Sequence, residues 1–445
     1  MLDTAATRAE VLRLAVPALL TLIAEPLFLL ADTAIIGHLG TAPLAGLGIA
    51  ATVLGTAVGL FVFLAYATTA LVSRRLGAGA HGAALAAGLD GLWLSVVLGA
   101  GTALILGLAA APIVATFGAG ADAAAQAVIY LRISALGIPP MLAVLALTGV
   151  LRGLQDTRTP LIASVLGFGA NIALNVALVY GVGLGIAGAA WGTVIAQTGM
   201  ALGLGTVVVA AARRHGASLR PRPRDVLAAA GAGVPLLVRT LALRGAILLT
   251  TWVAAGFGDT TLAAHQVTWT IWTFLVFALD ALAIAGQALI GKALGAGDVT
   301  QTRALTALMT RWSVWFGVAL GIAIALAAPL LPPLFTPDPG VRAALTIGLL
   351  VVAAGQPVAA YAFLLDGVLI GAGDARWLAG AGVVLLIAYL PVVAVLTVWR
   401  PALAGAGSGV ALAAIWGGFL IFMTLRALVL GYRARQDTWL VTGLR

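Results

Sequence analysis

Long apolar stretches, each long enough to cross a lipid bilayer, follow one another along almost the whole chain. A membrane-spanning helix needs about 20 mostly apolar residues. The polar and Gly/Pro-rich breaks predict twelve spans, at 11–37, 44–72, 85–113, 124–150, 160–182, 186–212, 228–256, 262–292, 302–330, 341–370, 376–400 and 403–432. Only 9% of the residues are charged and 62% are hydrophobic, which leaves too few polar residues to cover a soluble domain. We therefore predict an all-α polytopic membrane protein that resides in a lipid bilayer.

The breaks between the predicted spans differ in charge. Basic residues gather in every second break, whereas the alternate breaks hold only Arg342 and Arg400. Because basic loops face the cytoplasm, we expect both termini to be cytoplasmic, in the inner membrane of a bacterial cell. The first apolar run is too long for a signal peptide. The membrane therefore accounts for the net charge of +9, and we expect no nucleic-acid partner.

The second half of the chain repeats the first at one fixed offset, without gaps. This repeat offset takes Pro17 to Pro235. It also aligns glycine, aspartate and arginine positions, namely Gly149, Gly153, Asp156 and Arg158 with Gly367, Gly371, Asp374 and Arg376. Six predicted spans in each half give both halves the same direction across the membrane, as in transporters built from parallel repeats. The expected parts are an amino-terminal six-helix lobe at 1–212, a cytoplasmic basic linker at 213–227 and a carboxyl-terminal six-helix lobe at 228–445.

Ionisable and amide side chains inside the predicted spans cost free energy and need a reason. Glu25 and Asp32 lie seven residues apart on the first span, on nearly the same helix face, with Pro26 between them as a kink. Asn171 and Asn175 share a face of the fifth span. A carboxylate withdrawn from water could exchange a proton near neutral pH or bind a small cation. The alternative is a structural hydrogen bond between helices.

The repeat does not duplicate this polar cluster. At the repeat offset, Asp32, Glu25, Asn171 and Asn175 correspond to Thr250, Leu243, Tyr389 and Val393. A purely architectural role should have left more of the cluster in both halves. We therefore expect the ion-handling site in the amino-terminal lobe.

The second half contains charged residues of its own. Arg239 and Arg244 lie in the seventh span and Asp280 in the eighth. They could form a buried structural pair or contact a substrate. Asp366 lies near the predicted cytoplasmic end of the tenth span, where it could join such a pair, contact a substrate or simply reach interfacial water.

Several kinds of chemistry leave no signature in the chain. It contains no cysteine, no P-loop motif and no paired histidine ligands. We therefore expect no cofactor, no dedicated metal site and no enzymatic activity, and an ion gradient would have to drive any transport.

Four short motifs resemble the MATE (multidrug and toxic compound extrusion) family. They are Asp32–Leu39, Leu151–Pro160, Leu279–Ala281 and, closest to the DinF-like branch, Leu365–Gly371. The resemblance spans essentially the whole chain. It implies a V-shaped antiporter of twelve helices that exports small organic compounds in exchange for protons or sodium ions. We expect such a transporter to act as a monomer.

The resemblance also implies roles for particular residues. In similar proteins, polar residues of the first, fifth and sixth helices form a coupling pocket, and the matching positions here are Asp32, Asn171, Asn175 and Thr193. Pro17 matches a proline at which the first helix of similar transporters bends. Position 175 holds Asn where many relatives hold Asp, and Phe28 stands where some hold Tyr. With one acid fewer, unless Glu25 substitutes, proton coupling at Asp32 is favoured over sodium.

Two other functions are compatible with a membrane protein of this size. One is a flippase for lipid-linked saccharides from the same broader superfamily. Such flippases often have additional spans and a more cationic cavity, whereas only Arg239 and Arg244 are basic candidates here. The other is a membrane-embedded enzyme, which the absence of a nucleophile–base or metal cluster in the spans disfavours.

Overall fold

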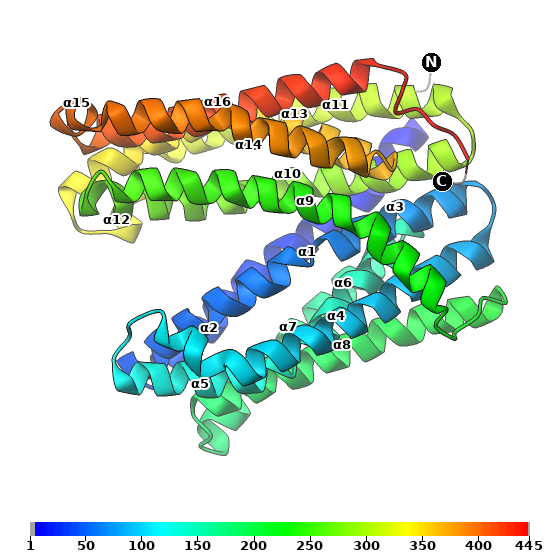
Figure 1. The fold of residues 1–445 in the computed structure, drawn as a ribbon, viewed down its shortest axis with the longest axis horizontal. Coiled ribbons are helices and arrows are strands. Elements are labelled where there is room, and N and C mark those ends of the chain that lie inside the picture. Colours follow the sequence, from blue (N-terminus) through cyan, green and yellow to red (C-terminus); the bar gives the residue numbers. More distant parts are fainter. Residues whose placement is uncertain (1–4, 444–445) are drawn as a thin grey trace. The chain divides into compact units, whose positions relative to one another are not determined.

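A computed structural model describes residues 5–443, except for the side chains of Glu25 and Leu29. The described chain is helical and contains no strand (Figure 1). The elements are α1 (Ala5–Gly37), α2 (Thr41–Leu60), α3 (Phe63–Gly77), α4 (His81–Ala115), α5 (Ala121–Ala135), α6 (Ile138–Gly153), α7 (Arg158–Val176), the π-helix η1 (Ala177–Gly181), α8 (Ile186–Arg214), α9 (Pro223–Ala255), α10 (Asp259–Gly295), α11 (Val299–Ala327), α12 (Pro332–Phe335), α13 (Pro339–Gly371), α14 (Ala375–Val398), α15 (Arg400–Gly405) and α16 (Ser408–Arg435).

The helices confirm the twelve predicted spans. Within the described residues, 11 helical segments are long and apolar enough to cross a membrane, and the bent pair α5 and α6 supplies the twelfth. Their axes differ by 50° at a break near Gly137, just before two prolines. The last predicted span begins too early: residues 400–405 form the short helix α15, and α16 begins at Ser408 after Gly407, whose φ is 104°.

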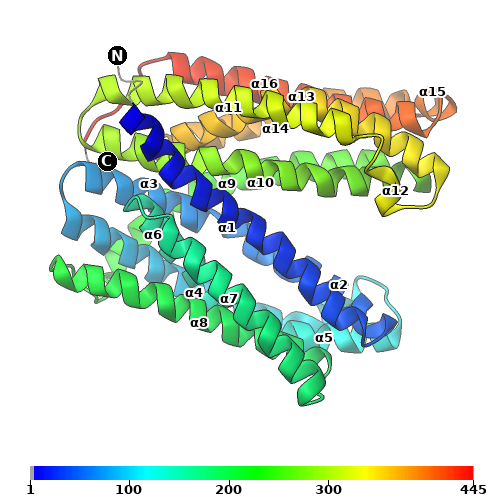
Figure 2. The same ribbon diagram turned by 180° about the vertical axis from the view of Figure 1, so that it is seen from behind.

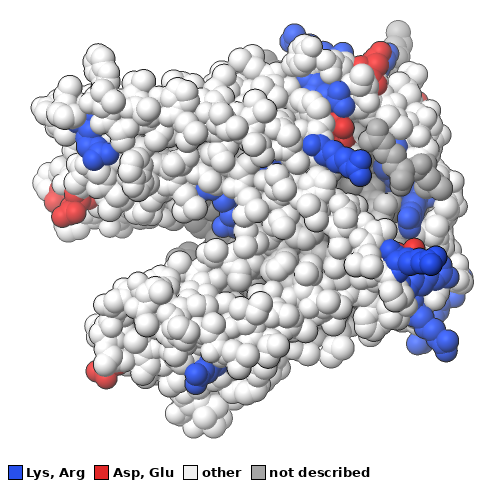
Figure 3. Space-filling model, viewed as in Figure 1, with Lys and Arg blue, Asp and Glu red and all other residues white. Residues whose placement is uncertain are grey.

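The outer surfaces of the helices are apolar. Leucines such as Leu108, Leu202 and Leu326 are 74%, 66% and 72% exposed, and charged side chains are sparse over the helical faces in view (Figure 3). Such exposure in water would cost about 25 cal/mol per Å² of apolar surface. These faces are therefore lipid-facing.

The described chain divides into two compact units. The amino-terminal unit holds Leu12–Val234, and the carboxyl-terminal unit holds Pro235–Leu294 and Asp298–Thr442, together with the start of α1 up to Val11. In the first unit α3 and α4 pack on α6, and α7 packs along α8 (Figure 2); in the second, α13 packs between α11 and α16. Residues 213–227, the predicted linker, run from the end of α8 into the first turns of α9.

Close helix crossings confirm the internal repeat. In the amino-terminal unit, Gly149 and Gly153 of α6 lie against the backbone of Ala65 and Thr69 of α3, so closely that an added side-chain carbon would collide. At the repeat offset, the corresponding positions form the same crossing between α13 and α10, through Gly367, Gly371, Ala283 and Gln287. Small residues allow such close approach between membrane helices. Both halves thus share one scaffold.

Candidate functional site

A chain of polar side chains joins α1, α7 and α8 inside the amino-terminal unit. Asn175 Nδ2 donates a hydrogen bond to Asp32 Oδ1 at 2.6 Å and one to Asn171 Oδ1 at 2.9 Å. Asn171 Nδ2 donates to Thr193 Oγ1 at 3.1 Å. Asp32, Asn171 and Asn175 are 4%, 2% and 0% exposed. The structure therefore brings together four of the side chains that the sequence singles out.

The carboxylate of Asp32 has a neutral partner. Among the described side chains, Asn175 is the one that forms a hydrogen bond with Asp32, and no arginine or lysine pairs with it. A buried carboxylate without a cationic partner carries an uncompensated charge, which is costly. The site therefore favours uptake of a positive charge, either a proton or a bound cation.

Asn175 has unused hydrogen-bonding capacity. Its Oδ1 atom is buried and has no partner within the described part of the chain. It lies against Gly192 of α8, where an added side-chain carbon would overlap with it. Because buried polar atoms are nearly always paired, this oxygen is an acceptor that is available to a donor.

Aromatic side chains surround the polar chain. Phe28 of α1 stacks on Phe168 of α7 with ring centroids 4.9 Å apart. Tyr130 of α5 is buried, and its phenol lies close to Thr193 and Ser134. Tyr130 could not be recognised from the sequence, because a tyrosine in an apolar span resembles an ordinary core residue. The side chain of Glu25, the other predicted acid, lies outside the described residues.

The start of α7 and the proline kink of α1 are connected. Pro17 has no N–H, so the carbonyl of Arg13 loses its usual helical donor. Thr157 Oγ1 lies 3.3 Å from this carbonyl and donates to it. Asp156 in turn caps α7, because its Oδ1 accepts from the backbone N–H groups of Arg158 and Thr159, each at 3.0 Å. Pro26 also lies inside α1, so the helix is weakened on both sides of its middle.

The carboxyl-terminal unit buries a charged cluster of a different kind. Asp366 of α13 pairs with Arg239 of α9 through both carboxylate oxygens and lies 3.3 Å from Arg426 of α16. Asp366 is 5% exposed, which fits the alternative of a buried charge pair and not that of a carboxylate in interfacial water, because these helices enclose it. Arg244 and Asp280 are partly buried on α9 and α10. The sequence analysis did not single out Arg426, although an arginine inside the last predicted span is itself a signal of a buried charge. No spacing links it to Asp366.

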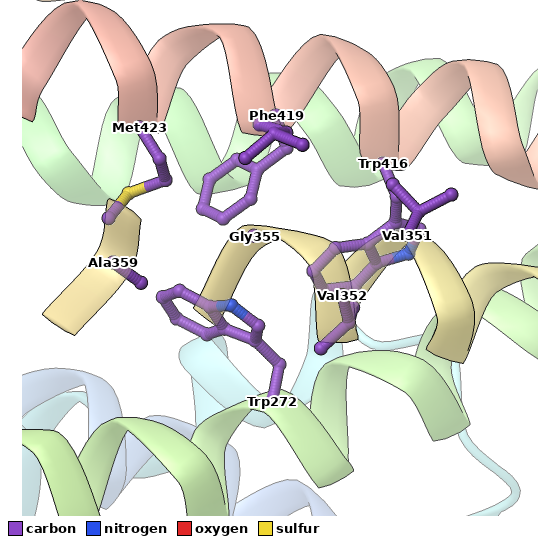
Figure 4. A pocket seen from close by; sticks show the side chains of 9 residues that line it. Trp272, Val351, Val352, Gly355, Ala359, Trp416, Phe419 and Met423 are labelled. Atoms are coloured by element: carbon purple, nitrogen blue, oxygen red, sulfur yellow. The ribbon is translucent and has the colours of Figure 1, made fainter. Parts of the chain in front are cut away.

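Aromatic rings also fill the carboxyl-terminal unit. Trp272 of α10 meets Phe419 of α16 edge-on at 5.3 Å, and Trp416 and Met423 lie beside them (Figure 4). The cavity between these rings measures about 20 Å³, which is room for a single water molecule. In this conformation the cluster is therefore core packing and offers no preformed space for an organic compound.

Comparison with known proteins gives consistent matches along the chain. A family model described as MatE matches residues 17–177 and 235–399, two segments whose first residues, Pro17 and Pro235, correspond in the repeat. Protein DETOXIFICATION 44, chloroplastic, of Arabidopsis thaliana is 31% identical over 97% of this chain and 83% of its own length. The DNA damage-inducible protein F of Escherichia coli (strain K12) is 34% identical over 65% of this chain and 64% of its own length.

Solved structures share the fold. A mutant of the Vibrio cholerae MATE transporter VcmN superposes with a TM-score of 0.87 at 23% identity, covering 99% of this chain and 100% of that chain. A MATE protein in a bent conformation gives 0.86 at 22% identity, covering 96% of this chain and 95% of that chain. A MATE protein in a straight conformation gives a TM-score of 0.85 at 21% identity, covering 96% of this chain and 95% of that chain. At these identities the likeness concerns the fold alone.

Proposed function

The chain belongs to the MATE family of multidrug and toxic compound extrusion transporters, and from this premise we propose that it exports cationic or amphipathic organic compounds in exchange for protons. The observation that carries the proposal is the burial of Asp32 beside a neutral amide instead of a basic side chain. A buried carboxylate without a cationic partner favours neutralisation by a proton. We therefore propose that Asp32 carries the proton.

Asn175 can serve both protonation states of Asp32. In the structure, Asn175 Nδ2 donates a hydrogen bond to Asp32 Oδ1 at 2.6 Å, as it would to the ionised carboxylate. When Asp32 takes up a proton, its hydroxyl becomes a donor, and rotation of the Asn175 amide presents the unpartnered Oδ1 as the acceptor. An asparagine here is therefore compatible with exchange of a proton without a second acid.

Sodium is the less favoured coupling ion. Among the described side chains, a cation bound by Asp32, Asn171, Asn175 and Thr193 would meet one formal negative charge and several neutral oxygens. No group of three or more His, Cys, Asp or Glu side chains that could hold a metal occurs within the described residues. Protonation of the single carboxylate needs no further ligands.

The two prolines of α1 suggest how the protonation state of Asp32 could change the conformation of this helix. Relatives of the same fold have been solved in conformations named bent and straight. We propose that α1 changes its bend at Pro17 and Pro26 when Asp32 is protonated, with Thr157 holding the carbonyl that Pro17 leaves without a donor. We propose that the transporter lies in a bacterial inner membrane with both termini in the cytoplasm. It would act as a monomer, with lobes at 1–212 and 228–445.

The coupling ion is tested in proteoliposomes that contain the purified chain. Export of a fluorescent organic cation is measured under a pH gradient without sodium and under a sodium gradient at equal pH. The proposal expects transport with the pH gradient alone. Transport with sodium alone would contradict it, and movement of lipid-linked saccharides without export of the cation would indicate a flippase.

A further inference from the structure

A π-helix follows the candidate site directly. Helix α7 ends at Val176, one residue after Asn175, and η1 continues over Ala177–Gly181. π-Helical turns hold well under 1% of residues in proteins and often occur at functional sites. The extra residue per turn rotates the side chains that follow Asn175. Tyr180 thereby points at α1.

Tyr180 forms a hydrogen bond with the last turn of α1. Its hydroxyl donates to the carbonyl of Ile35 at 2.5 Å, although 145 residues separate the two in the chain. This carbonyl is available because the N–H of Leu39 turns to Ile36 instead, at 2.9 Å. The preceding carbonyl, of Ala34, accepts from His38 Nδ1 at 2.7 Å. Two carbonyls that a helix end leaves without partners are thus satisfied by side chains.

The same residues line an open groove. Ala34, Ile35, His38 and Tyr180 surround a space of about 450 Å³ with mostly apolar walls. Asp32 lies one helical turn before this groove and is buried, whereas Tyr180 is 48% exposed. The bond between Tyr180 and Ile35 therefore joins α1 to η1 at the groove, one helical turn beyond the buried carboxylate.

We propose that Tyr180 is a positioning residue for Asp32. Pro26 weakens α1, so the part of α1 after Pro26 depends on its contacts with α7 and η1 to hold Asp32 near Asn175. The hydroxyl of Tyr180 supplies one such contact beyond the site, just as the ring pair of Phe28 and Phe168 supplies one before it. The inference rests on the proposed function, because positioning matters to the exchange of a proton at Asp32.

The second half of the chain has no equivalent of this contact. At the repeat offset, Ile35 and Tyr180 correspond to Val253 and Val398, and Val398 is 74% exposed. A contact needed only to join helix ends should be duplicated along with the glycine crossings. The hydroxyl is instead confined to the half that contains Asp32, as a role in positioning this carboxylate requires.

The variant Tyr180→Phe tests the proposal because it removes only the hydroxyl from a half-exposed ring. Loss of a hydrogen bond of about 0.5–1.5 kcal/mol changes the equilibrium between the joined and separated positions of α1 and η1 by roughly 2- to 10-fold. We expect pH-driven export to fall by a factor in this range and its pH profile to move. Other groups near Asp32 are Tyr130 of α5, Asn171 and Asn175 of α7 and Thr193 of α8, with His38 beyond it on α1. Tyr432→Phe, on an exposed tyrosine of α16, is the matched control.

A spectroscopic measurement separates positioning from activity. The chain has no cysteine, so spin labels can be attached at Ala34→Cys and Val182→Cys, on exposed residues of the two joined segments. We expect Tyr180→Phe to weaken the dipolar broadening between the labels, whereas Tyr432→Phe leaves it as it is. A His38→Gln variant in the same background checks that a shifted pH profile does not come from His38.

The outcomes distinguish the two proposals. If the unmodified chain exports nothing under a pH gradient, the proposed function fails, and the label distance still reports whether Tyr180 holds α1. If the chain does export but Tyr180→Phe changes neither the pH profile nor the broadening, the positioning role is overturned.

Discussion

Asp32 and Thr250 occupy corresponding places in the two halves of the chain, and each contacts the fifth spanning helix of its own half. Asp32 accepts a hydrogen bond from Asn175 at 2.6 Å, and Thr250 Oγ1 lies 2.8 Å from the hydroxyl of Tyr389. Both contacts are buried. Tyr389 corresponds to Asn171 at the repeat offset. The duplicated scaffold thus keeps a polar contact at this place in both halves, and only one of them contains a charge.

The difference indicates what the contact does in each half. A hydroxyl pair such as Thr250 and Tyr389 satisfies itself and has no proton to exchange near neutral pH. The carboxylate of Asp32 faces an amide with an unpartnered oxygen. The buried carboxylate of the other unit, in turn, has cationic partners: Asp366 engages Arg239 and Arg426. This difference supports the proposal that Asp32 exchanges the proton, whereas Thr250 and Asp366 have structural roles.

The largest expected effect on stability is that of Asp366→Asn. Breaking a buried ion pair leaves a charge without compensation and costs about 3–5 kcal/mol. Asp32→Asn should cost far less, because it removes a buried charge that has no cationic partner. Thermal unfolding of both variants in detergent gives the comparison. Equal losses of stability would show that the two carboxylates do not differ in kind.

Substitution of the glycines at the repeated crossings should affect both halves alike. Gly149→Ala and Gly367→Ala each push a methyl group into the backbone of a neighbouring helix. Such overpacking costs about 1–3 kcal/mol, and the matched positions should lose similar amounts in the same unfolding assay. Gly101→Ala, at an exposed glycine with open space around it, is the control. A loss in one half only would contradict the shared scaffold.

The smallest effect is expected from Thr250→Val. This variant keeps the shape of the side chain and removes its hydrogen bond with Tyr389. We expect a loss of about 0.5–1.5 kcal/mol in stability and no change in the pH dependence of export. A shifted pH profile would mean that the second half also takes part in coupling.

The sequence predicts the fold well because lipid requires long, uninterrupted helices. Every predicted span has its helix, and the repeat offset reappears in matching glycine crossings. The bend between α5 and α6 was missed because hydrophobicity alone does not register a break at Gly137 inside an apolar run. For a similar reason, the last span is predicted to begin at residue 403, whereas α16 begins at Ser408, after Gly407.

The candidate site was only partly predictable. Residues on one helix face, such as Asn171 and Asn175, follow from spacing, and their meeting with Asp32 and Thr193 follows from the family resemblance. Tyr180 could not be found this way, because its direction depends on the π-helical turn. The pairing of Arg239 with Asp366 links positions 127 residues apart, which no local pattern encodes.

Proton release tests the assignment of Asp32 most directly. The purified chain is mixed with a transported organic cation in weakly buffered detergent solution that contains a pH indicator. If substrate and proton compete for the transporter, addition of the substrate releases protons from the unmodified chain and from Thr250→Val. Asp32→Asn should bind the substrate and release none. Release from Asp32→Asn equal to that from the unmodified chain would contradict the account.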